Sequence, residues 1–188
     1  LSDIAADAAL RFEPVAFEAG HTLSYDIAPD LTVRGDGERL AQAVAVLLDN
    51  AIKYAAPHTE IRLDALRQGR NACVQVENRG ADIPADKLPH IFDRFYRADE
   101  SRTGGDSFGL GLPIAKAIAE AHHGAIRCDS SGGITRFTIT LPCQADIRAL
   151  FQMTPYYWNT PADGAARLAE CERLTTEIGF RFLVYQKV

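Results

Sequence analysis

The chain has 188 residues, 47% hydrophobic and 24% charged, which is the composition of an ordinary soluble globular protein with one good core. A net charge of −5 argues against nonspecific nucleic-acid binding, which needs a basic surface, so no nucleic-acid partner is expected. No apolar run approaches the roughly 18 residues of a membrane span and no signal peptide is visible, so no membrane contact by this chain is expected.

The first third of the chain predicts two helices and two strands. Residues 1–20 indicate a short helix that gives way to an extended segment at Pro14, and residues 21–28 and 31–35 indicate strands. Asp36 is a good N-cap for a helix that runs to about Ala56 and stops at Pro57. Its apolar stripe has helical spacing and consists of Leu40, Val44, Leu47, Leu48, Ala51 and Ile52.

The middle of the chain predicts a hairpin, a loop-rich segment, a helix and a second pair of strands. Residues 59–78 indicate two antiparallel strands joined near Gly69, and short helical pieces are expected around 87–95. About a dozen loop-like residues at 98–108 are long enough to suggest a functional lid. A helix is expected from Leu112 to about His122, followed by strands at 125–130 and 134–142.

The four cysteines, Cys73, Cys128, Cys143 and Cys171, are far apart and form no CxxC pair. Two of them lie in apolar, strand-like stretches, where a free thiol behaves as a small hydrophobe. We therefore expect reduced, structural cysteines in a cytoplasmic protein and no metal site of the Cys/His type.

An asparagine interrupts the end of the longer helix in the stretch "LLDNAIKYA", residues 47–55. Asn50 points about 110° away from the apolar stripe, at 100° per residue, with Lys53 and Tyr54 beside it. This set of side chains suits a nucleotide. The Asn50 amide oxygen could bind Mg²⁺, the Lys53 cation could bind phosphate, and the Tyr54 ring could lie against a base. The same three residues are also compatible with ordinary solvent-exposed side chains that bind nothing.

Three further stretches carry candidate chemistry, each with a plain structural alternative. "NRGADIP" (78–84) offers an amide for a base edge and Gly80 for close approach by a ligand, or it is a simple turn. "IFDRFYR" (91–97) offers arginines for phosphate, or it is a packed helical turn. "SFGLGLPIAKAIAE" (107–120) offers backbone N–H groups at a glycine-rich helix start, or it is a helix entry whose Leu110, Leu112 and Ile114 pack inward.

Taken in order and with these spacings, the four stretches resemble the catalytic ATP-binding domain of bacterial two-component sensor histidine kinases. "LLDNAIKYA" matches the asparagine box, "VENRGADIP" the first glycine box, "IFDRFYR" the phenylalanine box and "FGLGLPIAKAIAEAHHG" the second glycine box. The resemblance covers residues 1 to about 142. It implies an α+β fold, the two-layer α/β sandwich of the histidine kinase/Hsp90/gyrase ATPase type, with a mixed sheet of about five strands backed by three helices.

The resemblance also implies roles for residues of this chain in binding ATP and Mg²⁺. Asn50 would coordinate Mg²⁺, and Asn50, Lys53 and Arg97 would form the catalytic set on the phosphates. The remaining nucleotide contacts would come from Tyr54, Asn78, Gly80, Ile83, Gly109, Leu110, Gly111, Leu112 and Thr135. Asn78 stands where the family usually has Asp, and its amide oxygen can still accept from the adenine amino group.

Two positions depart from the family pattern. Val46, one turn before Asn50, replaces a residue that is often Asn or Glu, and Asp82 replaces the second glycine of the first glycine box. These departures motivate an alternative function, a nucleotide-binding pseudokinase with little or no phosphotransfer.

No histidine of the chain has the family's phosphoacceptor pattern, because none of the five is followed by Glu or Asp. We therefore expect a monomeric cytoplasmic fragment that does not autophosphorylate alone, because it lacks the acceptor histidine. The parent kinase is expected to be either membrane-anchored or soluble. Its expected partners are the phosphoacceptor hairpin of the same kinase, which mediates dimerisation, and a response regulator.

The character of the chain changes after Pro142, so a boundary is expected between a catalytic domain at 1–143 and an extension at 144–188. Within the extension, residues 160–179 indicate a helix and residues 180–187 a strand. "MTPYYWNTP" and "FRFLVYQK" are similar to the C-terminal end of ribosomal RNA guanine methyltransferases, but no S-adenosylmethionine loop precedes them. The alternative is an accessory helix–strand piece.

Overall fold

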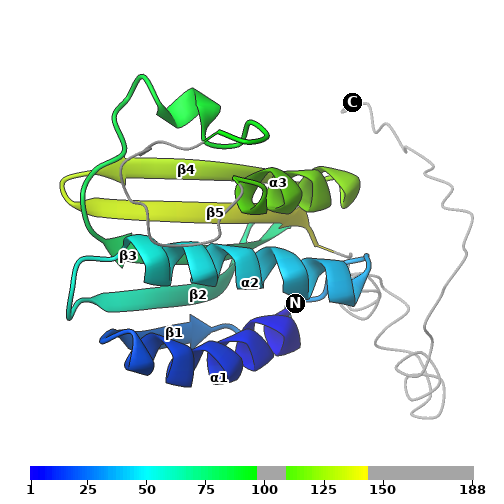
Figure 1. The fold of residues 1–188 in the computed structure, drawn as a ribbon. Coiled ribbons are helices and arrows are strands. Elements are labelled where there is room, and N and C mark those ends of the chain that lie inside the picture. The colour runs from blue at the N-terminus through cyan, green and yellow to red at the C-terminus, as the bar shows by residue number, and fades with distance from the viewer. Residues whose placement is uncertain (97–108, 144–188) are drawn as a thin grey trace, which may run out of the picture. The chain divides into compact units, whose positions relative to one another are not determined.

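The computed structural model describes residues 1–96 and 109–143, which form two layers, a sheet and a set of helices on one of its faces (Figure 1). The strands are β1 (Thr22–Ile27), β2 (Glu60–Gln68), β3 (Asn71–Arg79), β4 (Ala125–Ser131) and β5 (Ile134–Pro142). The helices are α1 (Ser2–Glu18), α2 (Gly37–Tyr54) and α3 (Gly111–Ala121), with a 3-10 turn, η1 (Leu88–His90). The expected α+β sandwich is confirmed.

The sheet is mixed and has the strand order β1-β2-β3-β5-β4. The β1–β2 pair is parallel and the other pairs are antiparallel. Alternate residues of the central strands, such as Val74, Val76, Phe137 and Ile139, are buried, as expected for strands with one face covered by helices. The core therefore lies between the sheet and the helical layer.

Helix α2 forms as its sequence predicts. Asp36 is the N-cap, and its Oδ1 accepts hydrogen bonds from the N–H groups of Glu38 at 3.0 Å and Arg39 at 3.1 Å. The predicted stripe lies in the core, with Ile52 partly buried and with Ala43 as an additional buried member. The helix ends at Tyr54, slightly earlier than expected, because Ala55 is already extended.

Two expectations about the N-terminal third are wrong. Helix α1 continues through Pro14 to Glu18, because Pro14 lies on the exposed side and Ala16 beyond it is fully buried. Residues 31–35 form no strand and contribute one isolated bridge, from Val33 to Cys143. The N–H of Leu31 instead donates to Ser2 Oγ at 2.9 Å, so this segment is tied to the start of α1.

Several other expectations can be compared directly with the described residues. The hairpin turn at Gly69 is confirmed, with a positive φ of 60°. Of the helical pieces expected around 87–95, only the short η1 forms. Among the helices of 1–96 and 109–143, none has the length and apolar character needed to cross a membrane. The expected lid at 98–108 and the extension at 144–188 lie outside the described residues.

Candidate functional site

Three segments meet at the end of the sheet where β3 stops and β4 turns into β5, on the left in Figure 1. The N–H of Ala56, just after α2, donates to the carbonyl oxygen of Arg79 at 2.7 Å. The N–H of Gly80 donates to the carbonyl oxygen of Gly133, in the β4–β5 turn, at 3.0 Å. The end of α2, the end of β3 and this turn are therefore held together by backbone hydrogen bonds.

A buried polar pair lies at this end of the apolar core. Asn78 on β3 and Thr135 on β5 are direct cross-strand partners, with only 3% and 6% of their surface exposed. They continue the core-facing rows that contain Val76 and Phe137. Among the described residues the Asn78 amide has no hydrogen-bond partner, and its oxygen and nitrogen keep some contact with solvent, so a ligand can reach them.

Gly80 has no positive φ, so its small size rather than its backbone conformation matters here. A Cβ at this position would lie 2.6 Å from the carbonyl oxygen of Tyr54 and 3.6 Å from Asn78 Nδ2. The glycine is therefore needed where β3 passes the end of α2, beside the buried amide.

The edge of α2 that carries Asn50 lies next to the start of α3. A Cβ at Gly111 would lie 3.3 Å from Cγ1 of Val46, which is one turn before Asn50. Asn50 is half-buried, whereas Lys53 and Tyr54 are exposed, Tyr54 at 42%. The asparagine box and the second glycine box are thus neighbours in space.

Helix α3 begins without a side-chain hydrogen bond at its N-cap, Leu110, in contrast to α2 with its Asp36 cap. The first N–H groups of a helix have no intrahelical partners, and such a helix start favours an anion. Leu110 and Leu112 are half-buried, and Leu112 packs against the core. Ile114 is 38% exposed, so the expectation that it packs inward is wrong.

The segment before α3 is docked on the phenylalanine box. Gly109 has a φ of +65°, and its carbonyl oxygen accepts from the N–H of Phe95 at 3.1 Å. A Cβ at Gly109 would lie 2.8 Å from the carbonyl oxygen of Tyr96. Glycine is therefore required here for two reasons, its positive φ and the close backbone approach.

The two phenylalanines of the phenylalanine box have different environments. Phe92 packs edge-on against Phe137, with ring centroids 6.3 Å apart. Phe95 is 71% exposed and has a φ of 64°.

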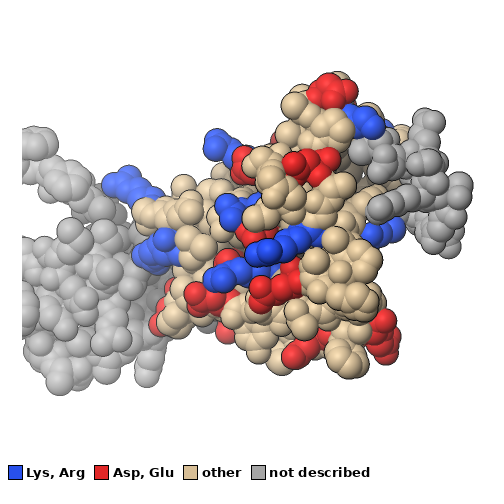
Figure 2. Space-filling model, turned by 90° about the vertical axis from the view of Figure 1, so that its left-hand side faces the viewer, with Lys and Arg blue, Asp and Glu red and all other residues tan. Residues whose placement is uncertain are grey.

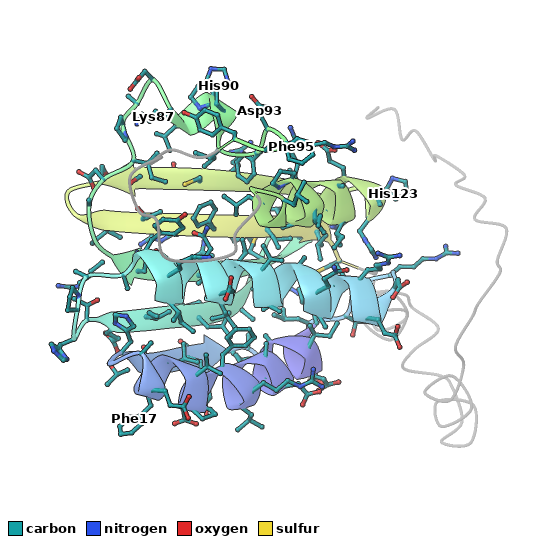
Figure 3. The ribbon with its side chains drawn as sticks, viewed as in Figure 1. Phe17, Lys87, His90, Asp93, Phe95 and His123 are labelled. Carbon is teal, nitrogen blue, oxygen red and sulfur yellow. The ribbon has the colours of Figure 1, made fainter. Side chains whose placement is uncertain are left out.

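His90 lies beside Asp93 on the outer side of the segment (Figure 3), with Nδ1 2.9 Å from Oδ2. Arg97, predicted to contact phosphate, lies outside the described residues.

Asp82 has a structural contact of its own. Its Oδ1 accepts a hydrogen bond from the N–H of Gly133 at 2.8 Å, which ties the loop after β3 to the β4–β5 turn. The next N–H in this loop, that of Ile83, donates to Ser130 Oγ at 2.8 Å. Ser130 Oγ in turn lies 2.8 Å from Thr135 Oγ1.

Sequence reasoning missed Ser130 and Gly133. The signal for Ser130 was present, because a hairpin that turns at Gly132-Gly133 brings Ser130 opposite Thr135. The signal for Gly133 was absent, because its bond to Asp82 joins residues 51 positions apart.

The end of the molecule where these segments meet faces the viewer in Figure 2. Lys and Arg side chains form a band across the middle of this face, with Asp and Glu above and below it. Side chains of both charge signs therefore lie on this face. Within the described part, no group of three or more His, Cys, Asp and Glu residues could hold a metal.

Comparison with known proteins agrees with this geometry. Residues 35–145 match the family described as "Histidine kinase-, DNA gyrase B-, and HSP90-like ATPase". The sensor protein DltS of Streptococcus agalactiae is 33% identical over 142 residues, which are 76% of this chain and 36% of DltS. The sensor histidine kinase TrcS of Mycobacterium tuberculosis is 43% identical over 115 residues, 58% of this chain and 23% of TrcS.

The fold is also that of a solved kinase domain. The catalytic domain of the histidine kinase ThkA superimposes with a TM-score of 0.67 at 25% identity, covering 76% of this chain and 92% of that domain. The matched part of this chain therefore spans only 36% of DltS and 23% of TrcS but nearly all of an isolated catalytic domain. The chain belongs to the family of histidine kinase-, DNA gyrase B- and HSP90-like ATPases, and it is a catalytic domain of the sensor histidine kinase type.

Proposed function

We propose that this chain is the ATP-binding half of a sensor histidine kinase and transfers the γ-phosphoryl group of Mg-ATP to a histidine on a dimerisation hairpin outside this chain. One observation carries the proposal, the pair of Asn78 and Thr135 at the end of the sheet, where the Asn78 amide has no hydrogen-bond partner among the described residues. An amide in this position offers a donor and an acceptor to a polar ligand, and a base edge matches both.

The other predicted residues fit a nucleotide whose base lies at this pair. Tyr54 would lie near the adenine, with Gly80 and Ile83 in the loop that borders the amide. The phosphates would approach the start of α3, where Gly109, Leu110, Gly111 and Leu112 offer backbone N–H groups without a side-chain cap. Lys53 and Arg97 would neutralise phosphate charge.

The side chains near the end of α2 are compatible with a bound Mg²⁺ ion. The half-buried Asn50 offers an uncharged amide oxygen, and Mg²⁺ accepts hard oxygen ligands. Val46 offers no ligand, but Mg²⁺ at nucleotide sites is usually held by one or two protein groups together with phosphates and waters. When bound, the ion supplies neutralisation of charge on the phosphates.

The proposed phosphoryl transfer needs no catalytic nucleophile from this chain, because the acceptor histidine is the nucleophile. The bond from the γ-phosphorus to the oxygen that bridges it to the β-phosphate breaks, and that oxygen leaves with the electron pair on ADP. A bond forms from an imidazole nitrogen of the acceptor histidine to phosphorus, and the imidazole proton passes to a base outside this chain. The contribution of this chain is positioning and charge neutralisation.

A pseudokinase that binds nucleotide without efficient transfer is the second candidate. Val46 supports it, because an apolar side chain lies between the edge of α2 and Gly111 where the family often has a polar one. Asp82 no longer supports it, because this carboxylate is occupied by the N–H of Gly133.

The partners follow from the proposed reaction. They are the dimerisation hairpin that carries the acceptor histidine and a cognate response regulator, and the proposed location is the cytoplasm. The boundary between a catalytic domain at 1–143 and an extension at 144–188 is part of the same proposal, with the fragment monomeric.

The test is a calorimetric titration of the 188-residue chain with ATP, with and without Mg²⁺, followed by transfer of γ-labelled phosphate to a separately supplied hairpin. Magnesium-dependent binding and labelling of the hairpin are expected. Binding without labelling favours the pseudokinase, and absence of binding in both conditions contradicts both candidates.

A further inference from the structure

The hydroxyl of Thr135 has one hydrogen-bond partner among the described residues, Ser130 Oγ at 2.8 Å. Ser130 also accepts the N–H of Ile83 at 2.8 Å, and both serine contacts involve the same oxygen. Ser130 therefore stands between a backbone donor in the loop after β3 and the hydroxyl next to Asn78.

This chain of contacts has a preferred direction. The N–H of Ile83 can only donate, so it occupies one acceptor site of Ser130 Oγ. A hydroxyl that accepts a hydrogen bond is polarised to donate the next one. Either hydroxyl of this pair can donate, and the polarisation favours donation by Ser130 to Thr135 Oγ1. In that direction the proton of Thr135 is left for a ligand acceptor.

The direction matters because position 78 is Asn. An amide presents an oxygen acceptor on one side and an NH₂ donor on the other, and it can turn over to suit either partner. Asn78 alone therefore accepts the amino group of adenine or, turned over, donates to the O6 of guanine. A carboxylate would reject guanine at this point, whereas an amide does not.

We propose that Ser130 is a positioning residue for base selectivity, because it directs the proton of Thr135 towards the ligand. A donated proton matches N1 of adenine, which is an acceptor, and opposes the N1–H of guanine, which is a donor. The inference rests on the proposed function, since it places the base at Asn78 and Thr135.

The experiment compares ATP and GTP affinities of the 188-residue chain in the presence of Mg²⁺. Ser130→Ala is expected to lower the ATP-to-GTP affinity ratio at least tenfold, whereas Ser131→Ala, an exposed neighbour on the other face of β4, keeps it. Thr135→Val is expected to lower the ratio similarly, and adding Ser130→Ala to it changes the ratio no further. A merely structural serine would weaken both nucleotides alike.

A second measurement needs no variant and therefore covers the case in which Ser130→Ala does not fold. Wild-type chain is expected to bind 1-deaza-ATP, which lacks the N1 acceptor, at least tenfold more weakly than ATP. Equal affinity for the two nucleotides, or an unchanged ATP-to-GTP ratio in Ser130→Ala, overturns the role of Ser130 while ATP binding by the wild type stands. Failure of the wild type to bind ATP is the separate outcome that removes the proposed function itself.

Discussion

His122, at the end of α3, accepts the N–H of Asp36, the N-cap of α2, at its Nε2 with a distance of 2.9 Å. The other ring nitrogen, Nδ1, lies 2.7 Å from the carbonyl oxygen of Ile118, so it carries the proton. The ring is neutral in this arrangement, because Nε2 must be unprotonated to accept.

This hydrogen bond predicts a stability effect. His122→Ala removes the acceptor for the Asp36 N–H and the link between two helices, and it should lower the free energy of unfolding by about 1–2 kcal/mol. Urea unfolding of the full chain measures it. His123→Asn is the matched control, because His123 is exposed at the outer end of α3 (Figure 3) and Asn tolerates its φ of 57°. Equal effects at both positions would contradict the prediction.

Gly35 is the second half of the same contact. A Cβ at Gly35 would overlap the imidazole ring of His122, so Gly35→Ala should force the ring away from the Asp36 N–H. We expect a loss of unfolding free energy of about 1–3 kcal/mol. In the double variant with His122→Ala the two losses should not add, because the overlapping ring is gone. Full additivity in urea unfolding would show that the two residues act independently.

Asn50→Asp tests the proposed magnesium ligand. The substitution places a negative charge where phosphate would lie, so Mg-dependent ATP affinity should fall at least tenfold, which corresponds to about 1.4 kcal/mol. The fold should persist, because residue 50 is only half-buried at the edge of the stripe. Calorimetry gives the affinity and circular dichroism the fold. An affinity equal to that of the wild type would show that α2 does not face the nucleotide.

Gly109→Ala should weaken ATP binding at least tenfold, because a Cβ there meets the Tyr96 carbonyl oxygen at 2.8 Å and displaces the start of α3. Gly69→Ala is the matched control, since Gly69 also has a positive φ, +60°, but a Cβ there meets nothing within 4 Å. Both variants share the backbone strain, and only Gly109 adjoins the proposed phosphate site. Similar ATP affinities for the two variants in the same titration would count against a phosphate site at Gly109.

Cys128 should make stability depend on pH in the alkaline range. Burial, with a smaller effect of the Asp129 charge, raises the pKa of its thiol from 9.0 to about 12. The unfolded chain therefore loses the thiol proton first, and stability that is complete below about pH 9 is lost as pH rises towards 12. Urea midpoints between pH 8 and 10.5 should fall more steeply for the wild type than for Cys128→Ser, which does not titrate there. The same pH dependence of the urea midpoint in the wild type and in Cys128→Ser would contradict this prediction.

The elements that sequence reasoning predicted correctly are those that depend on near neighbours. The cap at Asp36 bonds to residues two and three positions later, and the stripe of α2 repeats with the period of the helix itself. The β2–β3 hairpin needed only a turn at Gly69 and alternating strands on both sides. The end of α1 was predicted wrongly because Pro14 has a low helix propensity, whereas the burial of Ala16 beyond it outweighs that local preference.

The sequence by itself determined that this chain carries the boxes of an ATP-binding kinase domain, because those boxes are contiguous stretches with characteristic residues. Only the tertiary structure decided what surrounds them. The bonds from Asp82 to Gly133, Ile83 to Ser130 and Asp36 to His122 join residues 51, 47 and 86 positions apart. Such contacts depend on how the sheet pairs and how the helices pack on it, and no local pattern of side chains specifies them.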